Sequence, residues 1–177
     1  VAEIALWGFP GIVSRSRGGQ FEGDMANLDQ IDRRLLAELQ DDGRMSNVEL
    51  AERIHLSAPQ TLRRVRALED SGVISRYAAL VSPPALGLEV TAFVALSLDR
   101  EQFRNVREVE RNVMAFPEII ECHTVSGDFD YLLKVVAANL KSLSQFLTDR
   151  LMQVPGVSGV RSMVCLEEIK PHSSLPT

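Results

Sequence analysis

The chain has 177 residues, a formal net charge of −5 and 45% hydrophobic residues. This length allows one large or two small domains, and the composition is typical of a folded globular chain. No apolar run approaches the roughly 18 residues of a membrane-spanning helix, so the sequence predicts none. Cys122 and Cys165 form no C-x-x-C pair and the three histidines lie far apart, which excludes a disulfide-rich scaffold and a zinc finger. The acidic balance argues against nonspecific coating of nucleic acid, while leaving room for a local basic surface.

Residues 1–24 have no clear hydrophobic period, and we exclude them from the fold prediction. They lack the positive start and the A-x-A cleavage pattern of a secretory signal. Met25 directly precedes a strong helix start, so we interpret it as the natural first residue and 1–24 as an extension. The alternative is an apolar arm that docks Leu6, Trp7 and Phe9 on a partner.

Residues 28–72 predict three short helices. Apolar side chains at helical spacing indicate the first, which ends at Gly43. Two capping boxes, Ser46 to Glu49 and Ser57 to Gln60, begin the second and third helices, and the third stops at Gly72. The side chains expected to face inward are Leu28, Ile31, Leu35, Leu36 and Leu39, then Val48, Ala51 and Ile54, then Ala58, Leu62, Val65 and Leu68. Two capped helices joined by a short turn predict a helix-turn-helix, and the alternating residues 73–81 predict the strand of a wing.

The third helix turns an arginine-rich face to solvent, and every basic residue between 28 and 76 is an arginine. Opposite its apolar stripe lie Gln60, Arg63 and Ala67, which are candidates for reading base edges in a major groove. Candidate phosphate contacts are Arg44, Arg64, Arg66 and Arg76, and the DNA-binding set is completed by Ser57 and Thr61. The alternative is a solvated arginine-bearing helix in an all-α bundle.

A second set of elements follows the hinge at Ser82-Pro83-Pro84. The pattern predicts strands over 90–98, 119–126, 131–137 and 157–169 and helices over 103–116 and 140–153. This βαββαβ order is that of a ferredoxin-like sandwich with strand order 4-1-3-2. Cys122 and Cys165 then lie on opposite edge strands, as buried thiols without a disulfide.

Helices cover only one face of such a sheet, and the apolar content of its strands predicts that a second subunit covers the other. A dimer would present two recognition helices to two half-sites of DNA. The densest polar cluster, residues 126–131, follows the second strand. Gly127-Asp128 is good hairpin chemistry, and the two carboxylates are too few for a calcium site.

Two long motifs carry a resemblance to a known family. They are Leu28-Asp29-x-x-Asp32, Asp42-Gly43-Arg44, Glu49-Leu50-Ala51, Leu56-Ser57 and Arg64-Val65-Arg66-x-Leu68-Glu69-x-x-Gly72-x-Ile74 in the first half, and Glu121-Cys122-His123-x-Val125-Ser126-Gly127-Asp128-Phe129-Asp130-Tyr131 in the second. On these residues the chain resembles the Lrp/AsnC (feast/famine) transcriptional regulators over residues 28–170. The expected fold class is therefore α+β, a winged helix-turn-helix followed by a ferredoxin-like sandwich.

The resemblance implies an effector cleft at subunit interfaces, lined by the 126–131 loop and the last strand. Its expected residues are Gly127, Asp128, Asp130, Tyr131, Ser162 and Met163. Backbone N–H groups of the Gly127-Asp128 turn would hold the α-carboxylate of an amino acid, and Asp128 or Asp130 the ammonium. For His123, which belongs to the family motif, a structural role is favoured over a catalytic one.

We therefore predict a cytoplasmic, sequence-specific DNA-binding regulator that senses an amino acid or a related metabolite. Its partners are double-stranded DNA, the effector and further copies, as a dimer and an octamer of four dimers; no metal, other cofactor or membrane is expected. The expected segments are the extension 1–24, the DNA-binding domain 25–76, wing strand and hinge 77–88, the ligand-responsive and oligomerisation domain 89–170, and the tail 171–177.

Two alternatives stay open at this point. The first is an architectural DNA-binding protein without an effector. The second is an enzyme like the siroheme decarboxylases, which resemble the same two-domain architecture. Such an enzyme needs histidine or arginine around a tetrapyrrole, and the chain offers few candidates: His123, Arg161 and Arg107. An arginine face on the third helix has no purpose there, so we expect no enzymatic activity.

Overall fold

The computed structural model describes residues 28–99, 106–171 and 174–177, which form two compact units. The chain divides between Ala78 and Ala79, inside the segment 77–88 expected as wing strand and hinge. Residues 1–24 and Met25 lie outside the described part, so the expectations for them are not addressed by the structure. No helix in the described ranges is long and apolar enough to cross a membrane.

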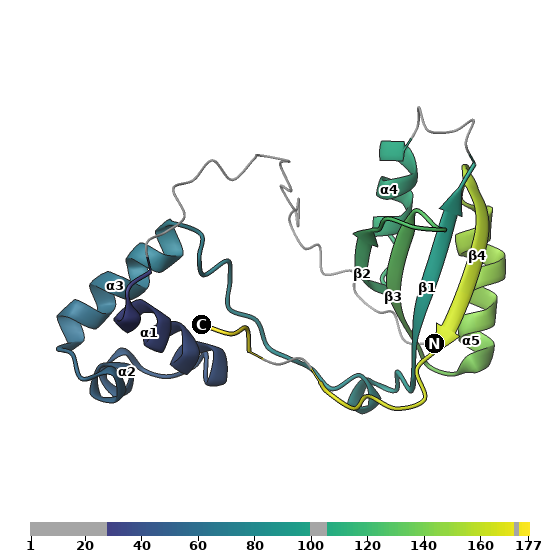
Figure 1. Ribbon diagram of the computed structural model, residues 1–177. Coiled ribbons are helices and arrows are strands. Elements are labelled where there is room, and N and C mark those ends of the chain that lie inside the picture. The colour runs from purple at the N-terminus through teal and green to yellow at the C-terminus, as the bar shows by residue number, and fades with distance from the viewer. Residues whose placement is uncertain (1–27, 100–105, 172–173) are drawn as a thin grey trace, which may run out of the picture. The chain divides into compact units, whose positions relative to one another are not determined.

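The N-terminal unit contains three helices, α1 (Gln30–Asp41), α2 (Asn47–Ile54) and α3 (Ala58–Asp70) (Figure 1). Reciprocal capping boxes begin α1 and α2: Asp29 pairs with Asp32, and Ser46 pairs with Glu49. These side chains satisfy backbone N–H groups that a helix start leaves without partners. The turn before α3 is tight because His55 adopts a left-handed conformation, with φ of 58°.

The helices close on a small apolar core of Leu35, Leu36, Leu50, Ile54 and Leu68. The predictions that Val48 and Leu62 face inward are wrong, because they are 59% and 39% exposed. Leu50 takes the place expected for Val48, since α2 is rotated to bury positions 50, 51 and 54. The predicted wing strand is also absent, because residues 73–82 form no ladder with any described segment.

The chain end belongs to this same unit. Residues 174–177 group with the three helices, whereas we expected 171–177 to be a separate tail. Leu175 donates its backbone N–H to Oε1 of Gln40 at 2.7 Å and accepts from Nε2 of Gln40 at 3.2 Å. One side-chain amide at the end of α1 thereby satisfies both polar groups of a single backbone residue.

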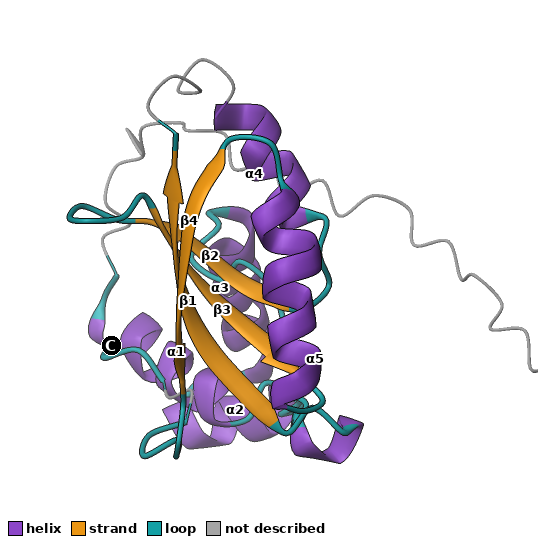
Figure 2. Ribbon diagram, turned by 90° about the vertical axis from the view of Figure 1, so that its right-hand side faces the viewer, coloured by secondary structure: helices purple, strands orange, loops and turns teal. Residues whose placement is uncertain are grey.

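The C-terminal unit is a four-stranded antiparallel sheet of β1 (Val90–Leu98), β2 (Ile119–Thr124), β3 (Tyr131–Ala137) and β4 (Val157–Val164). Its order is β2-β3-β1-β4, which confirms the predicted 4-1-3-2 arrangement. The helices α4 (Val106–Met114) and α5 (Leu140–Gln145) lie on one side of this sheet (Figure 2). The predicted ferredoxin-like sandwich is therefore confirmed.

Four elements of this unit differ from their predicted bounds or form. The strand predicted over 119–126 ends at Thr124, and the helix predicted over 103–116 ends at Met114. The helix expected over 140–153 is α5 followed by a π-helical turn, Phe146–Arg150, and a 3₁₀ turn, Leu151–Gln153. The wider turn brings both Phe146 and Leu151 into the core, while Leu140 is exposed. The last strand ends at Val164 instead of 169. Of the helix predicted over 103–116, residues 103–105 lie outside the described part.

The two faces of the sheet differ in what covers them. Alternate residues of β1, from Ala92 to Leu98, pack against the helices and are buried. Phe93 lies on the other face, which no described helix covers, and is 37% exposed. Cys122 and Cys165 are free, as predicted, but both are half-buried rather than buried. Burial, followed by the nearby Glu110 carboxylate, raises the pKa of the Cys122 thiol.

Candidate DNA-binding and effector-binding sites

The exposed face of α3 carries the candidate base-reading residues. Gln60, Arg63, Arg66 and Ala67 are all exposed. No described side chain forms an ion pair or hydrogen bond with the guanidinium of Arg63 or Arg66. Two unpaired guanidinium groups on the second helix of a helix-turn-helix are suited to bind the acceptors of a DNA groove and its phosphates.

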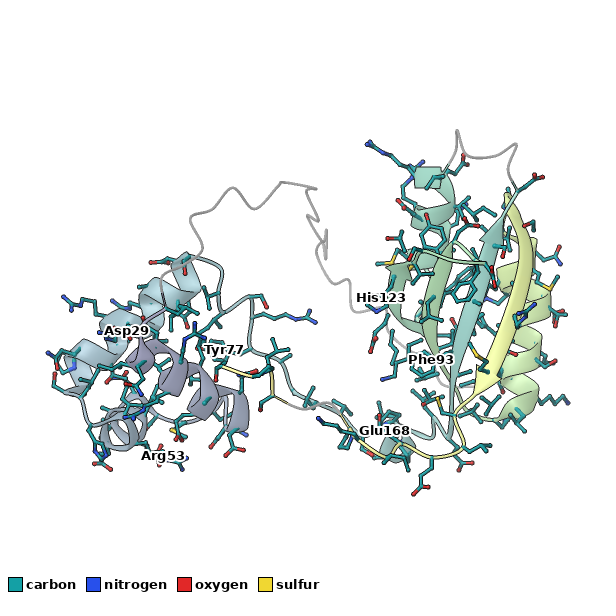
Figure 3. The ribbon with its side chains drawn as sticks, viewed as in Figure 1. Asp29, Arg53, Tyr77, Phe93, His123 and Glu168 are labelled. Atoms are coloured by element: carbon teal, nitrogen blue, oxygen red, sulfur yellow. The ribbon has the colours of Figure 1, made fainter. Side chains whose placement is uncertain are left out.

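Arg64 lies on the side of α3 that faces α1 and is held by two carboxylates. Its Nη1 is 2.7 Å from Oδ1 of Asp32 and 2.9 Å from Oδ2 of Asp29, and its side chain is 28% exposed. The hydrogen bond to Asp32, then that to Asp29, raises the pKa of Arg64. This arginine fixes α3 against the start of α1, so the structure gives it a positioning role (Figure 3 labels Asp29).

Thr61 does not lie on the exposed surface of α3 that was predicted to bind DNA. Its side chain is fully buried, and its hydroxyl donates to the carbonyl of Ser57 at 3.1 Å. The Ser57 hydroxyl donates in turn to Oε1 of Gln60 at 2.9 Å, and both residues are exposed at the start of α3. Exposed hydroxyl and amide groups thus stand beside the free N–H groups of this helix end, a position that favours phosphate.

Arg44 and Arg76 complete the predicted set from outside α3. Arg44 lies in the turn after α1, and Arg76 lies in the irregular segment after α3. Both side chains are exposed and bonded to no described residue. Nearby, Tyr77 donates its hydroxyl to Oε1 of Glu69 at 3.0 Å, which ties this segment to the last turn of α3 (Figure 3). Burial, then that carboxylate, raises the pKa of Tyr77.

The loop between β2 and β3 contains the first part of the candidate effector site. Gly127 has φ of 136°, which side-chain-bearing residues rarely adopt, and Asp128 is exposed. Asp130 is already occupied: its Oδ2 accepts from the Leu98 N–H at 2.7 Å. Asp130 therefore anchors the loop to β1, and Asp128 is the carboxylate of this loop that faces solvent.

Tyr131 does not face the loop surface. It pairs with Leu96 on the helix-covered side of the sheet, is 7% exposed, and donates its hydroxyl to Oε1 of Glu110 at 3.0 Å. Burial, then Glu110, raises the pKa of this phenol far above its ordinary value. The structure therefore gives Tyr131 a role in packing α4 on the sheet, in place of the predicted contact with an effector.

Ser162 and Met163 lie away from this loop in a single chain. Asp130 reaches β1 at Leu98, whereas Met163 pairs with Phe93, five residues earlier. At about 3.4 Å per residue, these positions are roughly 17 Å apart along the strand. Ser162 and Met163 also point to opposite faces of β4, because side chains alternate along a strand. One copy therefore does not bring the six predicted effector residues together.

Glu121, His123 and Arg161 were each named from the sequence, but these charged groups were not placed together on the helix-free face of the sheet. Nε2 of His123 lies 3.3 Å from Oε2 of Glu121, and Nζ of Lys134 lies 3.5 Å from Oε1 of the same carboxylate. At the opposite edge, Arg161 pairs with Ala95 and is exposed. The alternation of side chains along each strand could have predicted this placement, because every second residue lies on the same face of the sheet. The described residues contain no cluster of His, Cys, Asp or Glu that would hold a metal ion.

Comparison with known proteins matches both units. The sequence profile of a winged helix-turn-helix DNA-binding domain matches residues 28–75, and that of the Lrp/AsnC ligand binding domain matches residues 91–175. The chain is 43% identical over 143 residues to the leucine-responsive regulatory protein of Rhizobium meliloti, covering 81% of this chain and 92% of that protein.

Two solved structures are similar over most of the chain. One is a transcriptional regulator from Neisseria meningitidis in complex with L-Met, with a TM-score of 0.80 and 39% identity, covering 84% of this chain and 96% of that one. The other is a feast or famine regulatory protein from M. tuberculosis complexed with L-methionine, with a TM-score of 0.75 and 35% identity, covering 81% and 95%. The chain therefore belongs to the Lrp/AsnC family of DNA-binding transcriptional regulators.

Proposed function

We propose that the protein reads a specific operator through Arg63, Gln60 and Ala67, with Arg66, Arg44, Arg76 and the α3 start at Ser57 contacting phosphates. The observation that carries this proposal is that Arg63 and Arg66 are exposed on α3 and pair with no residue in the described ranges. An arginine that already had an acidic partner would have to exchange it for DNA, as Arg64 would. The neighbouring Arg63 and Arg66 have no such cost.

The experiment compares the protein's affinity for its own promoter region and for random DNA of equal length at fixed, moderate salt. We expect the promoter to bind at least 10³-fold more tightly, the lower end for specific recognition. Equal affinity for both DNAs would contradict the proposal. Arg107→Ala, a change on α4 in the other unit, serves as the control and should leave the ratio unchanged.

For the C-terminal unit, we propose an amino-acid effector bound between copies of the chain. The L-Met complexes of two relatives support this class of ligand. The separation of the Gly127-Asp128 turn from Met163 supports a site completed by a second copy. The turn would hold the carboxylate, Asp128 the ammonium, and Met163 from another copy the side chain.

We also propose that copies associate through the helix-free face of the sheet to form dimers, and that four dimers form an octamer. The apolar side chains Phe93 and Met163 on that face support the dimer.

Because the target is chromosomal DNA, we place the protein in the cytoplasm. We also propose that it has no enzymatic activity. The free arginines on α3, which catalysis would not need, support this choice over an enzyme.

A thermal-shift series with the twenty amino acids tests the effector. A ligand at 100 times its Kd adds about 2.7 kcal/mol to the stability of the folded protein. We expect methionine or leucine to raise the melting temperature and the Asp128→Ala variant to lose that response. No shift with any amino acid would favour the regulator without an effector.

A further inference from the structure

The helix-free face of the sheet carries opposite charges at its two edges. Strand parity and register place twelve described side chains on it: Thr91, Phe93, Ala95 and Ser97; Glu121 and His123; Leu132, Lys134 and Val136; Gly159, Arg161 and Met163. Glu121, on the edge strand β2, is the only acidic residue in this set. Arg161, on the edge strand β4, bonds to none of the residues that the structure describes. Phe93 and Leu132 lie between the edges.

Covering this face with a second copy would bury the guanidinium of Arg161, which no described residue of its own chain pairs with. An uncompensated buried charge is strongly destabilising, so Arg161 needs an acidic partner in the assembly. Glu121 of the same copy is three strand spacings away, about 14 Å, which is beyond the reach of an arginine side chain. Among the described residues of this face, the acidic partner of Arg161 must therefore come from the second copy.

The required pairing selects one of two symmetric arrangements. Two identical sheets that pack face to face with aligned strands are related by a two-fold axis either parallel or perpendicular to the strands. The perpendicular axis places β2 over β2 and β4 over β4, so that both Glu121 residues lie at one edge of the pair of sheets and both Arg161 residues at the other. The parallel axis places β2 of one copy over β4 of the other, so that Glu121 and Arg161 share an edge; their register leaves them two residues, about 7 Å, apart along the strands, which two long side chains can span.

Resting on the face-to-face dimer of the proposed function, we propose that two inter-subunit pairs, Glu121 with Arg161 of the second copy and the reverse, set the dimer's orientation with its two-fold axis parallel to the strands. Glu121 has room for this bond, because a carboxylate accepts at about four lone-pair positions and its side chain is 47% exposed beside His123 and Lys134. Phe93 and Met163 supply the apolar contact, and the charge pairs fix which edges meet (Figure 3 labels Phe93 and His123).

Charge reversal in the full chain tests the proposal. Glu121→Arg and Arg161→Glu should each raise the dimer dissociation constant at least tenfold, measured by sedimentation velocity during dilution. The double variant should return it to within about threefold of the wild type, and an equimolar mixture of the two single variants should form heterodimers. The control variants Glu108→Arg and Arg107→Glu make the same charge changes on α4, on the covered side of the sheet, and should have no effect.

The possible results separate this inference from the function on which it rests. Unchanged dissociation constants for both single variants, or a double variant as weak as the singles, would overturn the charge-set orientation while the dimer stands. A wild-type chain that is monomeric at all concentrations would overturn the face-to-face dimer together with the inference. If a single variant fails to fold, the double variant still decides between these results.

Discussion

Arg63 and Arg64 are neighbours in the chain, yet the 100° step between successive helical residues gives them different surroundings. Arg63 points to solvent, whereas Arg64 reaches Asp29 and Asp32 at the start of α1. Their removal should therefore affect different properties. Arg63→Ala should reduce DNA recognition and leave the fold intact, whereas Arg64→Ala should loosen the contact between α3 and α1.

The first prediction separates base reading from phosphate contact on α3. Arg63→Ala should cost about 1–3 kcal/mol at one base pair of the operator and relax the sequence preference there. Arg66→Ala should weaken binding to all sequences and reduce the slope of log affinity against log salt by about 1. Binding titrations at several salt concentrations, on the operator and on single-base variants, measure both effects. Equal behaviour of the two variants would contradict this division of roles.

The second prediction concerns the acid sensitivity of the N-terminal unit. The hydrogen bond from the Asp32 N–H, and then the interaction with Arg64, lowers the pKa of Asp29. A lowered carboxyl pKa contributes stability that is complete above the ordinary value near pH 4 and is lost as the pH falls through the lowered value. We expect the wild type to melt at a higher temperature than Asp29→Asn at pH 6, with the difference disappearing as the pH falls below about 4.

Asparagine is the appropriate replacement because it also caps helices well. The Asp29→Asn variant therefore removes the charge and retains the cap. A melting-temperature difference that stays constant from pH 6 to pH 2 would show that the ionised carboxylate contributes nothing.

At the scale of elements, the capping boxes and apolar periods were enough to locate α1, α2, α3 and the sheet. The bounds of β1 and β3 were predicted to the residue, because each is a run of alternating or buried side chains between clear turn signals. The wing strand was not obtained, because alternation alone does not provide a neighbouring strand to pair with. The π-helical turn after α5 was missed for a similar reason, since both helix types bury apolar residues at nearly the same spacing.

The third prediction tests the cap of α2. The Ser46 hydroxyl accepts from the Glu49 N–H at 3.3 Å, and the Glu49 carboxylate accepts from the Ser46 N–H at 2.9 Å. Ser46→Ala should destabilise the N-terminal unit by about 1 kcal/mol. Ser75→Ala, at an exposed serine whose side chain bonds to no described residue, is the matched control. Hydrogen exchange of the α2 amides reports the change locally, and equal protection in both variants would contradict it.

The candidate sites were predicted less completely than the elements. Helical phase correctly placed Gln60, Arg63, Arg66 and Ala67 on an exposed surface, since that depends only on sequence spacing. The acidic partners of Arg64 lie more than thirty positions earlier and depend on how α1 packs against α3. The effector residues present a further difficulty, because a site shared between copies is not determined by the sequence pattern of one copy.

At the scale of the whole molecule, association and DNA recognition depend on each other. One α3 contacts the bases of a single half-site, so a monomer makes only half of the specific contacts that a dimer makes with the operator. A symmetric dimer joins two such helices and recognises a DNA site with matching symmetry. Variants that weaken the dimer should therefore weaken operator binding even though no residue in contact with DNA has changed.

The last prediction uses this dependence on half-site spacing. Recognition helices of a two-fold dimer meet the same side of DNA at half-sites about 10–10.5 base pairs apart, or a multiple of that distance. Inserting five base pairs between the operator half-sites turns one of them to the opposite side of the duplex and should lower the affinity at least tenfold. Inserting ten restores the facing side and should recover part of the loss, as far as the segment between the two units permits. Mobility-shift titrations on the three DNAs measure this, and equal affinity for all of them would mean that the two recognition helices bind independently.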